Sequence, residues 1–237
     1  AGGGIVWDSD PREEYLEACL KGRYLSEPPV SFQLIETFLW SSGTGFRFLP
    51  DHLRRLASSA RYFGFRFREE PVRAALRSAI RNEAATGQRK VRLLLARNGE
   101  VNVEISPIAA ILKEAGPARV TLSKVAVSSR DPFVRHKTTH RGWRDEELRK
   151  AKADGFDEVI FLNERGEVTE GAITNIFIEA AGRLLTPPAA CGLLEGIWRR
   201  CVLADRSRRV SERVLYPEDL RTCRRILLTN SVRGMMR

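Results

Sequence analysis

The chain has 237 residues, of which 43% are hydrophobic and 30% are charged. This composition is typical of a folded globular protein with one large domain or two small ones. No apolar run approaches the roughly 20 residues that are needed to cross a bilayer. The first residues, AGGGIVWDSD, also lack the basic start and apolar stretch of a signal peptide. We therefore expect a cytoplasmic protein that makes no use of a membrane.

The net charge is +10, from 40 basic and 30 acidic residues, and most of it lies near the C-terminus. Between Arg199 and Arg237 there are 11 arginines and four acidic residues, which gives +7. A basic surface attracts phosphate, so a nucleic-acid-binding module is one hypothesis. Because the segment lacks the series of aromatic residues that a stacking platform requires, a solvated surface is the simpler interpretation. We expect no nucleic-acid partner.

The cysteines give no sign of a metal site or a disulfide framework. They form no CxxC pair, have no regular spacing and have no partnering histidine cluster. We expect no bound metal and mostly structural, reduced thiols at Cys19, Cys191, Cys201 and Cys223.

The first hundred residues mix helix and strand signals. Proline suits the first turn of a helix, apolar residues at helical spacing continue it, and Gly64 supplies a stop. Asn98-Gly99 provides the positive φ angles of a tight hairpin turn. We predict helices over residues 11–25, 50–64 and 71–87, a strand over 32–40 and a hairpin over 89–106.

The second half contains short strands joined by tight turns, interrupted by helices. Proline and glycine in residues 107–118 indicate a linker. We therefore predict a small α+β domain over 26–110 and a larger domain over 111–237. In the larger domain we expect strands over 120–128, 157–163, 168–171, 173–179, 184–188 and 225–230, a short strand near 210, and helices over 144–153 and 196–205.

One polar loop in this half, SSRDPFVRHKTTHRGW, carries two of the three histidines and a lysine. A lysine that is held near other cations loses its proton more easily and can act as a nucleophile. Lys137 is therefore a candidate, although a lysine in a polar loop is most often a plain surface residue. The assignment needs partner residues.

The segment VTEGAITNIF, residues 168–177, resembles the motif that follows the catalytic lysine in class IV (fold type IV) pyridoxal-phosphate enzymes. The resemblance implies a Schiff base between the cofactor and Lys137. It also implies that Glu170, 170 − 137 = 33 residues downstream, holds the protonated pyridine nitrogen. With that proton in place, the ring accepts the electrons that are released when a bond next to the imine breaks.

Three further segments resemble the phosphate-binding motifs of the same family. In HLRRLASSA the resemblance assigns the phosphate-binding guanidinium to Arg55. In TPPAACGLLEGIWR it implies a cup of backbone amides at a helix N-terminus, although Glu195 and Ile197 depart from the usual proline and threonine. The residues implied in phosphate binding are Arg55, Gly196, Ile197, Trp198, Asn230 and Ser231.

The resemblance also implies an architecture. It is an α+β, two-domain fold of the D-amino-acid aminotransferase type, with a small N-terminal domain, a larger C-terminal domain and the cofactor between them. Relatives of this kind are homodimers, so a homodimer is expected here.

Within the superfamily, the segments FQLIETF, HKTTHR and NSVRG look like the aminodeoxychorismate lyase domain of fused 4-aminobenzoate synthases. Residues 1–25 look like the end of a chorismate-binding domain, which implies fusion to or association with such a component. One departure concerns the tyrosine that members often carry four or five residues after the lysine, because Arg141 and Gly142 occupy those places here.

This resemblance implies elimination from 4-amino-4-deoxychorismate to give 4-aminobenzoate and pyruvate in folate biosynthesis. An anionic substrate needs cationic or hydrogen-bonding groups, and Arg135, His140 and Arg141 are candidates because they lie near Lys137 in sequence. Two alternatives stay open. One is a class IV aminotransferase for D- or branched-chain amino acids, and the other is an appendage of the synthase without cofactor.

Overall fold

The computed structural model of the chain describes residues 31–81, 87–108 and 117–236. Residues 32–237 form one compact unit, and the fold described below is that of this unit. The predicted helix over 11–25, the predicted domain remnant over 1–25 and most of the predicted linker lie outside the described residues.

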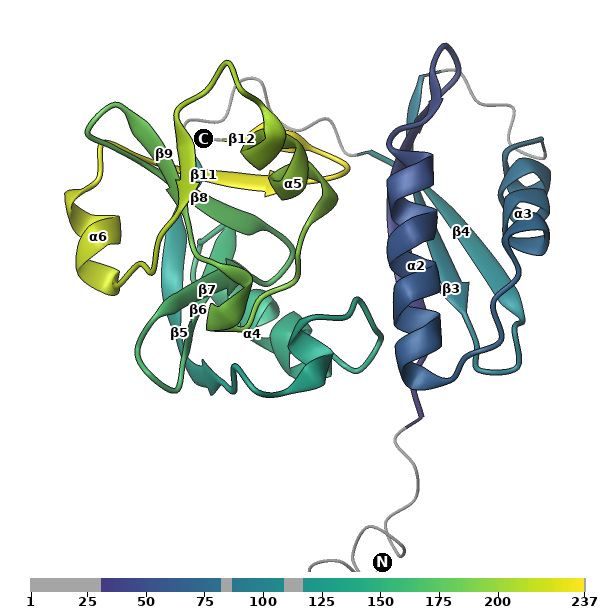
Figure 1. The fold of residues 1–237 in the computed structure, drawn as a ribbon, viewed down its shortest axis with the longest axis horizontal. Coiled ribbons are helices and arrows are strands. Elements are labelled where there is room, and N and C mark those ends of the chain that lie inside the picture. The colour runs from purple at the N-terminus through teal and green to yellow at the C-terminus, as the bar shows by residue number, and fades with distance from the viewer. Residues whose placement is uncertain (1–30, 82–86, 109–116, 237) are drawn as a thin grey trace, which may run out of the picture. The chain divides into compact units, whose positions relative to one another are not determined.

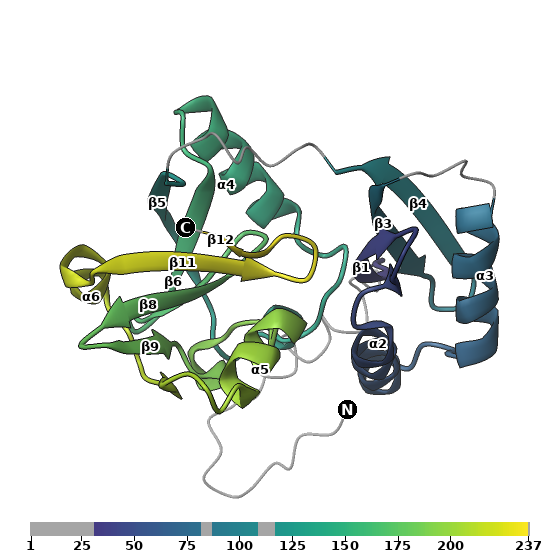
Figure 2. The same cartoon turned by 90° about the horizontal axis from the view of Figure 1, so that it is seen from above.

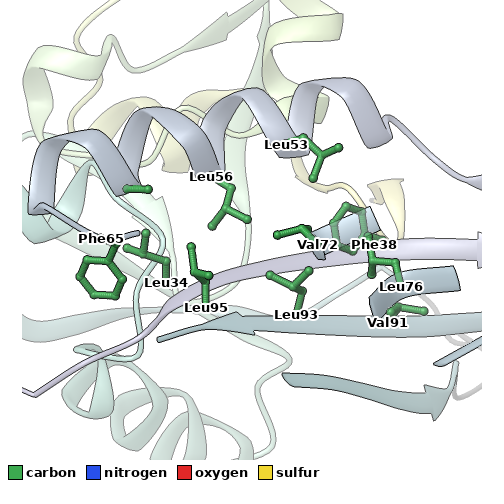
Figure 3. Close-up of a cluster of buried hydrophobic side chains, with 11 residues drawn as sticks. Leu34, Phe38, Leu53, Leu56, Phe65, Val72, Leu76, Val91, Leu93 and Leu95 are labelled. Carbon is green, nitrogen blue, oxygen red and sulfur yellow. The ribbon is translucent and has the colours of Figure 1, made fainter. Parts of the chain in front are cut away.

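The first sheet has four antiparallel strands in the order β2-β1-β3-β4. Helices α2 and α3 pack against it, and the side chains between them form a hydrophobic cluster that includes Leu34, Phe38, Leu56, Leu76 and Leu93 (Figures 1 and 3). The elements are β1 (Leu34–Ser41), β2 (Gly45–Phe46), α2 (Leu49–Phe63), α3 (Glu69–Arg81), β3 (Gln88–Leu95) and β4 (Val101–Pro107).

The two faces of strand β3 have different surroundings. Val91, Leu93 and Leu95 belong to the buried cluster. Side chains alternate between the two faces of a strand, so Lys90 and Arg92 lie on the face away from this core. The apolar side chains therefore pack in the hydrophobic cluster, and the basic side chains of Lys90 and Arg92 point away from it.

The predicted boundary of α2 is confirmed. The helix has proline in its first turn, and Gly64 ends it with φ of 70°, a left-handed conformation that is unfavourable for other residues. Helix α3 begins two residues before the predicted Pro71, since Glu69 and Glu70 form its first turn. Two negative charges suit that end of a helix.

The second sheet contains β5 (Val120–Val127), β6 (Glu158–Asn163) and β7 (Val168–Gly171) in the order β5-β6-β7. Strands β5 and β6 are parallel, so the chain must cross over between them. The crossover holds a short 3₁₀ helix, η1 (Pro132–Val134), the loop with Lys137, and α4 (Gly142–Ala153).

The third sheet has the order β10-β9-β8-β11-β12. Helix α5 packs against it, beside β8 and β11 (Figure 2). The remaining elements are β8 (Asn175–Ala180), β9 (Arg183–Thr186), η2 (Ala189–Cys191), α5 (Ile197–Ala204), β10 (Val210–Glu212), α6 (Pro217–Thr222), β11 (Arg225–Asn230) and β12 (Gly234–Met236).

Most predicted elements of the described part are present, and the α+β class is confirmed. The sequence did not predict β2, η1, η2, α6 or β12, because segments of two to six residues carry too little periodicity. The division into domains at 26–110 and 111–237 stays a prediction. No helix in the described ranges is long and apolar enough to span a membrane.

Candidate active site

A pocket of about 320 Å³ opens between the first sheet and the crossover loop. Its wall combines side chains from β1, α2 and β3 with the loop around Lys137, α4, the β7–β8 turn, the N-terminus of α5 and the β11–β12 turn. A volume of this size suits a small molecule.

The structure brings most of the predicted site residues to this pocket. Its lining includes Arg55, Lys137, His140, Arg141, Glu170, Gly196, Asn230 and Ser231. Arg135, Ile197 and Trp198 are not part of the lining. Arg135 is exposed and Ile197 is buried, while Trp198 packs edge-on against Phe48. A contact through the backbone amides of Ile197 and Trp198 does not depend on their side chains, so that part of the prediction is untested.

Lys137 is fixed by its backbone. Its carbonyl oxygen accepts from Ile35 N at 2.9 Å, and the neighbouring Thr139 N donates to Gln33 O at 2.9 Å. These bonds extend the start of β1 across the loop, so the lysine is attached to a strand of the first sheet. A loop that is pinned in this way holds its side chain more precisely than a free loop does.

The Lys137 amine is a good nucleophile at neutral pH. Burial lowers its pKa from 10.5 to about 7, and the positive charges of Arg141 and Arg55 act in the same direction. Glu36 and Glu170 oppose the shift. A pKa near 7 leaves a large neutral fraction, which is the form that attacks a carbonyl carbon or accepts a proton.

Glu170, on β7, is the buried acid of the pocket. Arg144 Nη1 donates to its Oε1 at 2.8 Å, and Asn175 Nδ2 donates to its Oε2 at 3.1 Å. Burial raises the pKa of Glu170, and the charge of Arg144 opposes that rise.

The turn after Glu170 is organised by another buried acid, Glu158. Its carboxylate accepts from Ala172 N at 3.0 Å and from Thr174 Oγ1 at 2.8 Å. Gly171 is required here because an added Cβ would overlap Thr174 Oγ1 and the Glu158 carboxylate. This network fixes the direction in which Glu170 and Asn175 leave the turn.

Arg55 is aligned by a buried carboxylate on β1. Its Nε and Nη2 donate to the two oxygens of Glu36 at 2.9 and 2.6 Å, and His52 Nδ1 lies 2.6 Å from Glu36 Oε2. Burial disfavours ionisation of Glu36, but the charges of Arg55 and His52 outweigh it and lower its pKa to about 2. The Nη1 end of Arg55 has only a 3.5 Å contact with Glu195 O, so it remains available at the pocket.

The N-terminus of α5 forms another part of the wall. Asn175 Nδ2 donates to Leu194 O at 2.8 Å, and a Cβ on Gly196 would overlap the Asn175 amide. The Gly196 backbone therefore packs directly on Asn175, and Gly196 lines the pocket at the end of the helix where free N–H groups favour an anion. The side chain of Glu195 is exposed and is not part of the lining.

These residues fit pyridoxal phosphate, the cofactor that the sequence predicts. The cofactor needs an amine for its aldehyde, an acid for its ring nitrogen, and cations or amides for its phosphate. Lys137 and Glu170 line the same pocket, yet within the described residues they form no direct ion pair with each other. Arg55 and the N-terminus of α5 are the groups that would bind its phosphate.

Several pocket residues were missed by the sequence analysis. They are Glu36, Lys90, Arg92, Arg144, Asn175 and Arg233, of which all but Glu36 belong to the lining. The alternation of basic and apolar residues in RKVRLLL was a usable signal for Lys90 and Arg92. Nothing local distinguishes Arg144 from the exposed arginine Arg149 on the same helix.

Comparison with known proteins identifies the same family that the sequence motifs predict. The family model described as "Amino-transferase class IV" matches residues 33–237. A "Putative aminodeoxychorismate lyase" of Schizosaccharomyces pombe is 32% identical over 190 residues, which cover 78% of this chain and 80% of that protein. A "Probable branched-chain-amino-acid aminotransferase" of Aquifex aeolicus is 36% identical over 86 residues, 35% of this chain and 28% of that protein.

Two solved structures share the fold. A "Putative amino-acid aminotransferase" from Mesorhizobium loti has a TM-score of 0.80 and 33% identity, covering 86% of this chain and 97% of that one. A "hypothetical aminotransferase" from Mycobacterium tuberculosis in a pyridoxal-phosphate-bound form has a TM-score of 0.75 and 24% identity, covering 86% and 79%. The expected fold type is confirmed, and pyridoxal phosphate is the cofactor of this family. The chain belongs to the class IV aminotransferase family.

Proposed function

We propose that this chain is a pyridoxal-phosphate-dependent lyase that converts 4-amino-4-deoxychorismate into 4-aminobenzoate and pyruvate. The S. pombe relative whose name carries this activity matches over 78% of the chain. The branched-chain aminotransferase relative from A. aeolicus matches over 35%. Because these enzymes share a fold, the contents of the pocket must separate the two activities.

The charge of the pocket wall carries the proposal. Lys90 and Arg233 line the pocket and have no ionic or hydrogen-bonded side-chain partner among the described residues. Arg92 has only a 3.9 Å contact with Glu104, and both of those side chains are more than 40% exposed. Unpaired cations of this kind suit a substrate with more than one carboxylate. A branched aliphatic side chain would gain nothing from them.

The register of the first sheet places two of these cations together. Arg92 pairs with Thr37 across β1 and β3, and Lys90 lies two residues earlier on the same face. Thr37, Lys90 and Arg92 all line the pocket. We propose that they bind a substrate carboxylate, with Arg141 and His140 closer to Lys137 in the chain.

When it is bound, pyridoxal phosphate supplies a sink for the electrons that are released from the carbon bearing the substrate nitrogen. Lys137 Nζ holds the cofactor and, once free, accepts the proton from that carbon of the substrate. Its pKa of about 7 matches this task near neutral pH. The same amine returns a proton to the departing three-carbon unit, which becomes pyruvate.

Glu170 and Arg55 have complementary roles in this proposal. Glu170 Oε1 or Oε2 accepts the hydrogen of the ring nitrogen, and Arg55 Nη1 binds the phosphate. Gly196 and the first amides of α5 bind the phosphate from another side, with Asn230 and Ser231 at the β11–β12 turn. Arg55 is aligned for this by its paired bonds to Glu36.

We further propose that the protein acts as a homodimer. Strand β5 lies at an edge of its sheet and exposes Leu122 and Val125, which are 36% and 42% accessible. An edge strand with exposed apolar residues is suited to pairing with another chain. Light scattering at micromolar concentration, with activity measured on the same sample, tests this. A fully active monomer would contradict the proposal. Association with a chorismate-binding component is a separate proposal that rests on residues 1–25.

The deciding experiment for the proposed function measures pyruvate. Purified protein loaded with pyridoxal phosphate is incubated with 4-amino-4-deoxychorismate and no keto acid, and 4-aminobenzoate and pyruvate are measured together. A lyase forms both in equal amounts, because elimination needs no second substrate. A class IV aminotransferase for D- or branched-chain amino acids turns over only when an amino acid and a keto acid are supplied. Equal product formation supports the proposal, and strict dependence on a keto acid refutes it.

A further inference from the structure

An arginine of the β5–β6 crossover, Arg144, contacts Glu170, the buried acid of the pocket. Arg144 lies in the first turn of α4, and its Nη1 donates to Glu170 Oε1 at 2.8 Å. Both side chains are only 8% exposed. The guanidinium also lies over the rings of Trp143 and Phe161, at 4.9 and 5.3 Å from their centroids. An ion pair combined with two ring contacts fixes the orientation of an arginine.

The other terminal nitrogen of Arg144 has no partner. Nη2 is buried, and no hydrogen-bond acceptor lies within reach of it among the described residues. Proteins rarely leave a buried donor unpaired, because the group has lost its water without a replacement. Arg144 also lines the pocket, and Glu170 is the only carboxylate that pairs with it in the described part of the chain. The positive charge of Arg144 is therefore directed at Glu170 alone.

The charge state of Glu170 depends on few groups. Burial raises its pKa, while the charges of Arg144 and Arg141 and the bonds from Asn175 and the Leu194 backbone favour the carboxylate. Lys137 is the other titratable group that senses Glu170. Arg144 is the only cation hydrogen-bonded to Glu170 within the described part of the chain. The charge of Arg144 is therefore the main effect that opposes the rise in the pKa of Glu170 caused by burial.

We propose that Arg144 is a positioning residue that keeps Glu170 ionised against the ring nitrogen of bound pyridoxal phosphate. One proton lies between the carboxyl group and that nitrogen. Burial alone favours its location on the carboxyl oxygen, whereas a cation behind the carboxylate favours its location on the nitrogen. The inference rests on the role proposed above for Glu170, and it adds the residue that makes this role effective in a buried site.

The test compares the visible absorption of the cofactor-loaded protein as a function of pH in the wild type, in four single variants and in one double variant. Arg144→Met removes the charge but keeps a long side chain over the two rings. Arg144→Lys keeps the charge. Glu170→Gln marks the result of losing the carboxylate, and Arg149→Met is the control, because Arg149 is an exposed arginine of the same helix that pairs with Glu146.

We expect the absorption and its pH dependence in Arg144→Met to move at least half of the way to those of Glu170→Gln. Arg144→Lys should restore most of the wild-type curve, and Arg149→Met should leave it unchanged. In the Glu170→Gln background, Arg144→Met should add nothing, because the group through which Arg144 acts is already absent. Turnover in Arg144→Met should fall at least tenfold with little change in KM.

A wild-type curve in Arg144→Met, or an additive effect in the double variant, would overturn the inference while leaving the lyase proposal intact. If Arg144→Met fails to fold, because it leaves a buried carboxylate unpaired, Arg144→Lys and the double variant still decide. A Lys variant that matches Glu170→Gln would refute the role of charge. Absence of a visible band in the wild type would refute the proposed function itself.

Discussion

Replacement of Lys137 by methionine should stabilise the cofactor-free protein at neutral pH. The amine is surrounded by protein and by the charges of Arg141 and Arg55, and its pKa falls from 10.5 to about 7. An unfolded chain keeps the ordinary value. Between these two pH values the unfolded state therefore binds a proton that the folded state does not, and folding carries a cost that methionine, of similar length, avoids.

The sign and size of the effect follow from that difference. The cost is fully present below about pH 7 and disappears as the pH rises to about 10.5. At ~1.4 kcal/mol per pH unit, it amounts to about 4 kcal/mol at pH 7 and about 2 kcal/mol at pH 9 for a pKa of about 7. These values are upper bounds, because Lys137 keeps some contact with the solvent in the open pocket.

The assay is urea denaturation of the cofactor-free wild-type and Lys137→Met proteins at pH 6, 7, 8 and 9, followed by tryptophan fluorescence. The difference in the free energy of unfolding should be nearly the same at pH 6 and 7 and should shrink from pH 7 to pH 9. Lys152→Met is the control, since Lys152 is exposed on α4 and its replacement should change stability by less than about 0.5 kcal/mol. A Lys137→Met protein that is no more stable than wild type at pH 7, or a difference that does not vary with pH, would refute the reasoning.

Four further predictions concern residues at or beside the pocket. Arg55→Ala should weaken cofactor binding by about 1.5 to 3 kcal/mol, the usual scale for a hydrogen bond to a charged group; an unchanged dissociation constant would move the phosphate site elsewhere. Glu36→Gln should remove about 3 kcal/mol of stability at pH 7, because the wild-type pKa of about 2 gives stability that is present above about pH 4.5 and is lost as the pH falls through 2; acid titration of unfolding checks this. Glu170→Gln should bind the cofactor but turn over more slowly, tenfold for each ~1.4 kcal/mol lost, so wild-type turnover would exclude it as the ring partner. Gly171→Ala should destabilise by about 1 to 3 kcal/mol through overlap with its own turn, whereas Gly142→Ala, with open space around it, should not.

The sequence by itself determined the family, the α+β class and most helices and strands of the described region. These features are local. Helix α2 follows from an apolar stripe with proline at its start and glycine at its end, and the β3–β4 hairpin follows from an Asn-Gly turn between two strand-like segments. That Lys137 and Glu170 belong to one site was predicted from a motif and a spacing along the chain, and both residues line the pocket.

Only the tertiary structure decided which side chains contact those residues and which of them are buried. Glu36 aligns Arg55 from 19 residues away, and Arg144 reaches Glu170 across 26 residues. Lys90 and Arg92 meet the pocket because strand register turns their face away from the core. An arginine on the surface and an arginine against a buried carboxylate have the same local sequence signal. Which of the two a given residue becomes depends on burial and on partners that are distant in the chain, and these exist only once the sheets have formed.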